Sequence, residues 1–243
     1  MENLKDKTVG EIVALNIGYA KVFQNYGIDF CCGGDILLAD AVSKIDVSLD
    51  DVLNEIEMTP HYNIPQALNF NAWSLDLLID YIVKFHHNYI RTEGPKIYTL
   101  LEKVCKAHGD TDKHLYEVLE LFKESLIDLH NHLDKEENVL FPFVYEVMNA
   151  LSKGKEAPEF HCGSVVNPIR VMMQEHEDEG IRFRKISALT NSYKAPEYAC
   201  NSYRLVLEEL KNFEENLHIH IHSENNILFP KAIKIEDSLI RFN

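Results

Sequence analysis

Two copies of one motif decide the fold of this chain: LHNHLDKEENVLFP at residues 129–142 and LHIHIHSENNILFP at residues 217–230. Eight of the 14 positions are identical without a gap. The 88-residue offset extends backward through positions that step by four and three, the spacing of one buried helix face. The two faces are Val118, Phe122, Ser125, Leu129, His132 and Glu136, and Val206, Leu210, Phe213, Leu217, His220 and Glu224. The repetition predicts two long helices with equivalent inward faces.

A second repeat supplies two more helices. Its members lie 90 residues apart and step by four, three and four, which again marks one helix face. They are Leu75, Ile79, Ile82 and His86, matched by Val165, Ile169, Met172 and His176. We therefore predict an all-α protein with an up-and-down four-helix bundle, whose main helices span residues 71–93, 113–140, 163–190 and 196–228.

The prolines and the remaining apolar clusters refine this plan. Pro142 and Pro230 are expected to end or kink their helices, because proline lacks the N–H of the helical ladder. Shorter helices are expected at 96–106 and after each Leu-Phe-Pro. Short apolar clusters predict a small helical domain at 1–57, a proline-containing linker at 58–70, and the bundle at 71–243.

Composition excludes several classes of protein. The net charge is −15, which disfavours general nucleic-acid binding and docking on an anionic membrane. No apolar run approaches the roughly 18 residues of a membrane span, and the first residues lack the pattern of a signal peptide. Five scattered cysteines do not form a disulfide framework. We expect a cytoplasmic protein.

The histidines and glutamates on the inward faces predict a metal centre. His132 and Glu136, like His220 and Glu224, are four residues apart and share a face. With His86 and His176 they make six candidate ligands. Two carboxylates among apolar neighbours are costly unless cations compensate them, and two metal ions bridged by the glutamates would do so. Nitrogen and oxygen ligands without thiolate favour iron or manganese over a structural zinc.

Nearby polar residues are less decisive. His87 is expected to point about 100° away from His86 and not to bind the metal. His130 and His218 are expected near solvent or around the ligands. Glu175, next to His176, would shuttle protons or relay a departing metal, or would simply face solvent; the residue pattern leaves these alternatives open.

The amino-terminal part carries a thiol motif, DFCCGGD at residues 29–35. Cys31 and Cys32 would accept iron, form a mixed disulfide or sense oxidation, or would be small buried residues of a turn. A helix beginning near Asp35 would lower a thiol pKa. The other three cysteines, Cys105, Cys162 and Cys200, are interpreted as structural.

These motifs together resemble the iron–sulfur cluster repair di-iron proteins. The resemblance rests on YGIDFCCGG at 26–34 followed by two copies of His-x-x-x-Glu-x-Asn-x-Leu-Phe-Pro. It implies a hemerythrin-like bundle, two iron ions with an oxo or hydroxo bridge, and the six ligands named above, with Glu136 and Glu224 bridging. It also implies a cytoplasmic protein, sometimes a homodimer, that donates iron to iron–sulfur proteins damaged by nitric oxide or peroxide.

Two other functions compete with repair. A diferrous pair could supply the two electrons that reduce two molecules of nitric oxide to nitrous oxide, which would make the protein an enzyme. Alternatively, the bundle would bind oxygen or nitric oxide reversibly as a carrier or sensor, which would leave the two adjacent cysteines unexplained.

Overall fold

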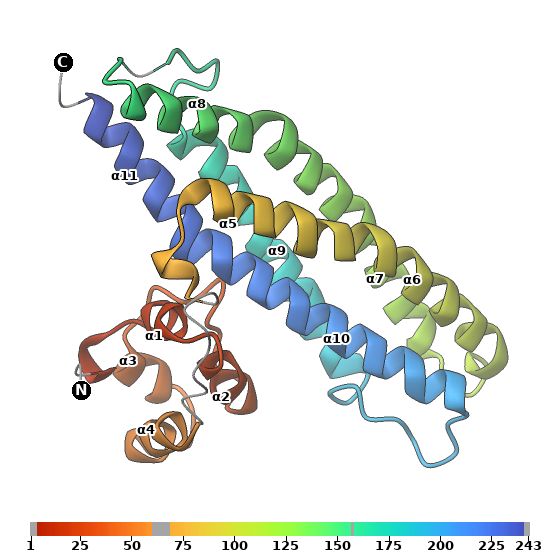
Figure 1. The fold of residues 1–243 in the computed structure, drawn as a ribbon. Helices are drawn as coiled ribbons and strands as arrows, with labels where there is room; N and C mark the ends of the chain where they lie inside the picture. Colours follow the sequence, from red (N-terminus) through yellow and green to blue (C-terminus); the bar gives the residue numbers. More distant parts are fainter. Residues whose placement is uncertain (1–3, 60–68, 157, 241–243) are drawn as a thin grey trace. The chain divides into compact units, whose positions relative to one another are not determined.

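The computed structural model describes residues 4–59, 69–156 and 158–240. Every regular element of two or more residues within these ranges is helical, which confirms the all-α prediction. Most of the expected linker, residues 60–68, lies outside the described residues. The chain divides into two compact units, residues 80–218 on the one hand and residues 1–79 with 219–243 on the other. Each is considered by itself (Figure 1).

The unit of residues 80–218 consists of long helices. Because their inward faces repeat with helical spacing, each buries one apolar stripe against the others. Its elements are the π-helical turn η4 (Ile82–His87), α6 (Asn88–His108), α7 (His114–Lys135), the π-helical turn η5 (Glu136–Leu140), α8 (Phe141–Ser152), α9 (Val166–Leu189) and α10 (Asn201–Ser223) up to residue 218.

Aromatic rings from three helices form the centre of this unit. Phe122 of α7 meets Phe213 of α10 edge to face, with ring centroids 5.2 Å apart, and meets Phe183 of α9 at 6.4 Å. Such edge-to-face pairs stabilise a core beyond the area they bury. Gly94 of α6 allows close approach of α7, because a Cβ there would lie 2.5 Å from a methyl carbon of Leu126.

The other unit combines the amino-terminal segment with the carboxyl end of the chain. Thr8 and Glu11 form a reciprocal capping box at the start of α1, and Gly27 follows α2 with φ of 67°. Its elements are η1 (Leu4–Asp6), α1 (Val9–Leu15), α2 (Tyr19–Asn25), α3 (Leu38–Val42), α4 (Leu49–Met58), η3 (Phe70–Ala72), α5 (Leu75–Tyr81) up to residue 79, the end of α10 from residue 219, the π-helical turn η6 (Glu224–Leu228) and α11 (Phe229–Ile240).

The predicted inward faces are confirmed. All twelve side chains of the two long series, from Val118 to Glu136 and from Val206 to Glu224, are at most 2% exposed. The eight positions of the shorter repeat, which include His86 and His176, are buried as well. Among the described residues, no helix has both the length and the apolar character that crossing a membrane requires.

Pro142 and Pro230 do not end their helices, and residues 96–106 do not form a separate short helix. Residues 96–106 belong to α6, which continues through Pro95 to His108. Pro142 does not end its helix either, because η5 leads directly into α8, where the proline occupies the first turn. Proline has no N–H to donate, and here it lies at the junction where the π-helical turn passes into the α-helix. The same arrangement recurs at η6 and α11.

Candidate metal centre

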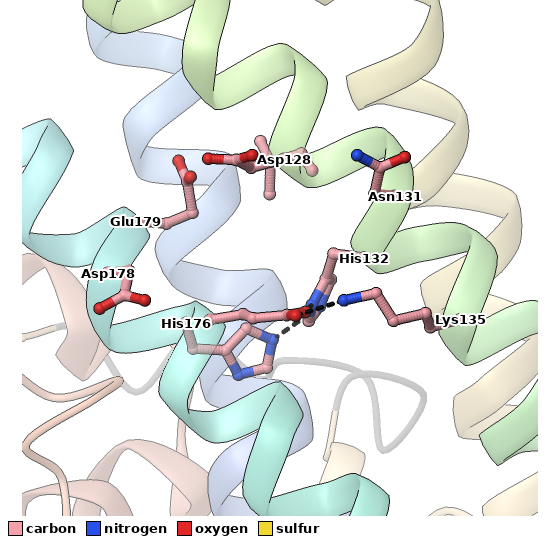
Figure 2. Close-up of a pocket in the computed structure, with 9 residues that line it drawn as sticks. Asp128, Asn131, His132, Lys135, His176, Asp178 and Glu179 are labelled. Carbon is pink, nitrogen blue, oxygen red and sulfur yellow. Dashed lines mark hydrogen bonds and ion pairs between the residues drawn. The ribbon is translucent and has the colours of Figure 1, made fainter.

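His132 is positioned on α7 by a carboxylate. A carboxylate only accepts hydrogen bonds, so His132 Nδ1–H donates to Glu175 Oε2 at 2.8 Å, and the lone pair lies on Nε2. That Nε2 lies 3.0 Å from His176 Nε2 and 3.5 Å from Glu136 Oε1 (Figure 2 shows the two histidines). Orientation of an imidazole by an outer carboxylate is the usual arrangement for a metal ligand.

Glu136 is the strongest local sign of a cation-binding site. It is the first residue of η5 and is fully buried, yet neither carboxylate oxygen accepts a hydrogen bond from the described residues. His87 Nε2 lies 3.4 Å from Oε2, and His132 Nε2 lies 3.5 Å from Oε1. A buried carboxylate without hydrogen bonds is destabilising by several kcal/mol, on the order of 3, unless a cation compensates it.

The structure brings His87, rather than His86, to Glu136. His87 is fully buried, and its Nδ1–H donates to Glu137 Oε1 at 2.7 Å, which leaves the Nε2 lone pair directed toward Glu136. His86 is also buried, and its Nδ1–H likewise donates to an acceptor, Asn216 Oδ1 at 3.1 Å, so it is the contact with Glu136 that distinguishes His87. The π-helical turn η4 contains one residue more than an α-turn, so that His87 reaches Glu136 while its neighbour His86 is buried as well. Helical spacing from Ile82 could not reveal this arrangement.

The arrangement in residues 80–218 fits metal ions. The ligand atoms of His132, Glu136 and His176 all lie within 4.8 Å of one another. Two imidazole nitrogens bound at right angles to one ion, each at about 2.1 Å, lie about 3.0 Å apart, and this is the distance between the Nε2 atoms of His132 and His176. A second group, His87 with the other oxygen of Glu136, shares this carboxylate. The buried His and Glu side chains therefore indicate a centre for two ions.

The remaining two predicted ligands lie in residues 219–243. His220, near the end of α10, and Glu224, the first residue of η6, are both fully buried. His220 Nε2 lies 3.1 Å from Glu224 Oε1. Their spacing of four residues reproduces that of His132 and Glu136, whose corresponding atoms lie 3.5 Å apart.

A polar cavity reaches two of the histidines. It has a volume of about 280 Å³ and lies between α7 and α9 (Figure 2). Glu175, one of its lining residues, contacts both His132 and Lys135. The hydrogen bond from His132 outweighs the effect of burial and, with Lys135, lowers the pKa of Glu175 to about 2. Glu175 is thus an anionic residue that lines the cavity, rather than one that only faces solvent. The cavity is lined by Asp128, Leu129, Asn131, His132, Lys135, Glu175, His176, Asp178 and Glu179.

The two adjacent thiols differ from expectation in their surroundings. The next α-helix begins at Leu38 rather than near Asp35. Cys31 is buried, and Cys32 is half-buried. The hydrogen bond with Cys32 and burial hold the pKa of the Cys31 thiol well above its usual value, instead of lowering it.

One cysteine interpreted as structural is exposed. Cys200 precedes α10, and His108 Nε2 lies 3.2 Å from its sulfur. The backbone N–H of Tyr203 and the contact with His108 lower the pKa of this thiol. The two residues are 92 positions apart, so no local pattern could have revealed the pair. Cys105, in contrast, is buried, and burial raises its pKa to about 11.

Comparisons with known proteins agree with this arrangement. Residues 78–232 match the hemerythrin HHE cation binding domain, and residues 5–59 match a domain of unknown function. The chain is 34% identical to a probable iron-sulfur cluster repair protein of Haemophilus influenzae over 219 residues, which cover 89% of this chain and 92% of that protein. It is 32% identical to the iron-sulfur cluster repair protein YtfE of Musicola paradisiaca over 235 residues, covering 96% and 98%. It is 29% identical to the iron-sulfur cluster repair protein ScdA of Staphylococcus epidermidis over 233 residues, covering 94% and 98%.

Both the buried His and Glu groups and the extent of these matches lead to one assignment. The cation-binding model spans more than half of the chain, and the relatives match it over nearly their full lengths. The chain belongs to the iron–sulfur cluster repair protein family.

Proposed function

We propose that this protein repairs iron–sulfur clusters damaged by nitrosative or oxidative stress, by delivering iron held in a dinuclear centre. The observation that carries the proposal is Glu136, a fully buried carboxylate whose oxygens accept no hydrogen bond from the described residues and face two imidazole nitrogens. The partners would be damaged iron–sulfur proteins of the cytoplasm. Iron is the cargo in this proposal, and manganese is the less favoured occupant.

We propose six ligands for the two ions. Three of them, His132, Glu136 and His176, are supported by their mutual distances. His220 and Glu224 are proposed from the repeat, with Glu136 and Glu224 bridging. For the sixth ligand the contact with Glu136 favours His87 over the His86 that helical spacing indicates. His86 would then orient its neighbours through Asn216.

The cavity beside His132 supports delivery rather than permanent storage. Glu175 is anionic and contacts a proposed ligand, while Lys135 holds its other oxygen. A cation leaving His132 and His176 would meet this carboxylate first, and Asp128 and Asp178 line the same cavity. A carboxylate is one of the ligands that non-haem ferrous iron accepts. Glu175 is therefore proposed as a relay for departing iron.

The proposal is tested by repair of a damaged enzyme. The iron-loaded full chain is incubated with a hydratase whose iron–sulfur cluster has been destroyed by nitric oxide, and recovery of hydratase activity is measured. The recovery should exceed that produced by the same amount of free ferrous iron. The control is the double variant Glu136→Ala with Glu224→Ala, which should lack both irons and repair activity. Equal recovery with free iron, or two irons retained by the double variant, would contradict the proposal.

The cavity also supports a second candidate, reduction of nitric oxide. Its volume of about 280 Å³ admits a diatomic gas to His132 and His176. This activity would appear as repeated formation of nitrous oxide in the presence of an electron donor. A single turnover, or none, would reject it while leaving repair to be decided by the hydratase assay.

A further inference from the structure

The loop that joins α2 to α3, in the unit of residues 1–79 with 219–243, brings three potential ligands together. The ligand atoms of Asp29, Cys31 and Cys32 lie within 4.8 Å of one another. Cys31 Sγ lies 3.3 Å from Asp29 Oδ1 and 3.9 Å from Cys32 Sγ. Neither cysteine forms a disulfide in the structure.

These distances match those expected around one tetrahedral ion. Two sulfur atoms bound to such an ion at about 2.3 Å lie about 3.8 Å apart, and the distance between the sulfurs of Cys31 and Cys32 is 3.9 Å. An oxygen at about 2.1 Å and a sulfur at about 2.3 Å lie about 3.6 Å apart, compared with 3.3 Å between Asp29 and Cys31. Small side-chain rotations would suffice to admit an ion.

The carboxylate is held in place and ionised. The backbone N–H groups of Cys31 and Cys32 both donate to Asp29 Oδ1 at 3.0 Å. Although burial raises the pKa of Asp29, hydrogen bonds from Gly33, Cys31 and Cys32 outweigh it and lower the pKa. The two backbone hydrogen bonds therefore hold a carboxylate oxygen beside the two thiols.

The backbone of the loop is held by the turn that begins with Glu224. Asn226 Nδ2 donates to the carbonyls of Phe30 and Cys31 at 3.3 and 3.2 Å, and Asn225 Nδ2 lies 3.4 Å from the Cys31 carbonyl. Gly34 is required for this contact, because a Cβ there would lie 2.9 Å from Asn226 Oδ1 and 2.6 Å from the Phe30 carbonyl. The two amides fix the backbone that positions the thiols.

We propose that Asp29, Cys31 and Cys32 form a separate mononuclear site for a thiophilic divalent cation, ferrous iron or zinc. The ion bonds to both sulfurs and to one carboxylate oxygen, and each thiol releases its proton to solvent as its sulfur binds. No electron is transferred. The fourth tetrahedral position remains for water or for a ligand from another molecule, since Cys32 is only half-buried. The site does not depend on iron delivery by the bundle.

Cobalt(II) is a suitable probe, because binding to thiolate produces a near-ultraviolet charge-transfer band that His and Glu ligands do not. The reduced, metal-free full chain is titrated with Co²⁺. Wild type should show the band and bind three ions per chain. Cys31→Ser with Cys32→Ser should lose the band and keep two ions. The matched control, Cys162→Ser with Cys200→Ser, should keep both the band and three ions.

Two further measurements keep the test decisive if the double serine variant folds poorly. Asp29→Asn preserves an oxygen for the backbone hydrogen bonds but removes the charge, and should weaken cobalt binding at the thiols at least about tenfold. In wild type, Zn²⁺ and Fe²⁺ are compared for their ability to remove the cobalt band and to slow alkylation of Cys31 and Cys32, which identifies the preferred ion. Absence of the band in wild type, or its persistence without both thiols, would overturn the proposal.

Discussion

Glu136→Gln is expected to raise the thermal stability of the metal-free protein and to lower that of the metal-loaded protein. Two buried carboxylate oxygens of Glu136, which accept no hydrogen bond from the described residues, face the Nε2 atoms of His87 and His132 at 3.4 and 3.5 Å. A glutamine removes the charge and can donate N–H to one of these nitrogens. Relief of an unsatisfied buried group contributes about 2 kcal/mol. For a chain of this length that corresponds to a rise of about 4–8 °C in the Tm of the metal-free protein.

The metal-loaded protein should respond with the opposite sign. An ion at a thousand times its Kd stabilises the fold by about 4 kcal/mol, and a variant that no longer binds it loses this contribution. Thermal unfolding is followed by circular dichroism with iron and with chelator, for wild type and for Glu136→Gln. A metal-free Tm that is unchanged or lower would refute the idea that Glu136 is held in the core for a cation.

Three more predictions concern other residues. By metal analysis, the His87→Ala variant should lose about one of the two irons, whereas the His86→Ala variant should retain both. The reverse result would favour His86, the ligand that helical spacing predicts. Burial raises the pKa of Glu214 in the folded protein from 4.5 to about 7. The contribution of this group to the stability of the folded protein is therefore full below pH 4.5, where the carboxyl group is neutral, and it is lost as the pH rises through 7. The free energy of unfolding, measured with urea, should therefore fall between pH 5 and pH 8 by about 2 kcal/mol less in Glu214→Gln than in wild type. An unchanged pH dependence would contradict this prediction. Iodoacetamide should label Cys200 before Cys105, as read by mass spectrometry, because Cys200 is exposed and its pKa is lowered. Equal labelling rates for the two thiols would contradict this prediction.

The fold could be predicted because its determinants are local. A buried helix face requires apolar residues at steps of three and four, and both copies of the repeat carry this pattern through six positions that are all buried. The pairing of His132 with Glu136 follows from the same periodicity, since residues four apart share a face whatever surrounds the helix. The cost of burying a carboxylate, which follows from residue type and pattern alone, then indicates a cation.

Local periodicity could not predict the π-helical turns or their effects. Because η4 contains one residue more than an α-turn, it brings His87 rather than His86 to Glu136. Likewise η5 lets the helix continue past Pro142. A π-turn is unfavourable in an isolated helix and is kept where tertiary packing compensates for it. The spacing of apolar residues therefore does not predict where a π-turn lies.

The sequence by itself determined an all-α chain with repeated inward faces and His–Glu pairs, because helical periodicity depends only on residues a few positions apart. Tertiary structure decided which neighbouring histidine meets Glu136, and it decided the chemical state of the thiols. Cys31 lies in a loop held by Asn225 and Asn226, nearly two hundred residues away, and Cys200 meets His108 across 92 residues. The pKa and the metal affinity of a group depend on what surrounds it in space, and only the packed chain specifies those neighbours.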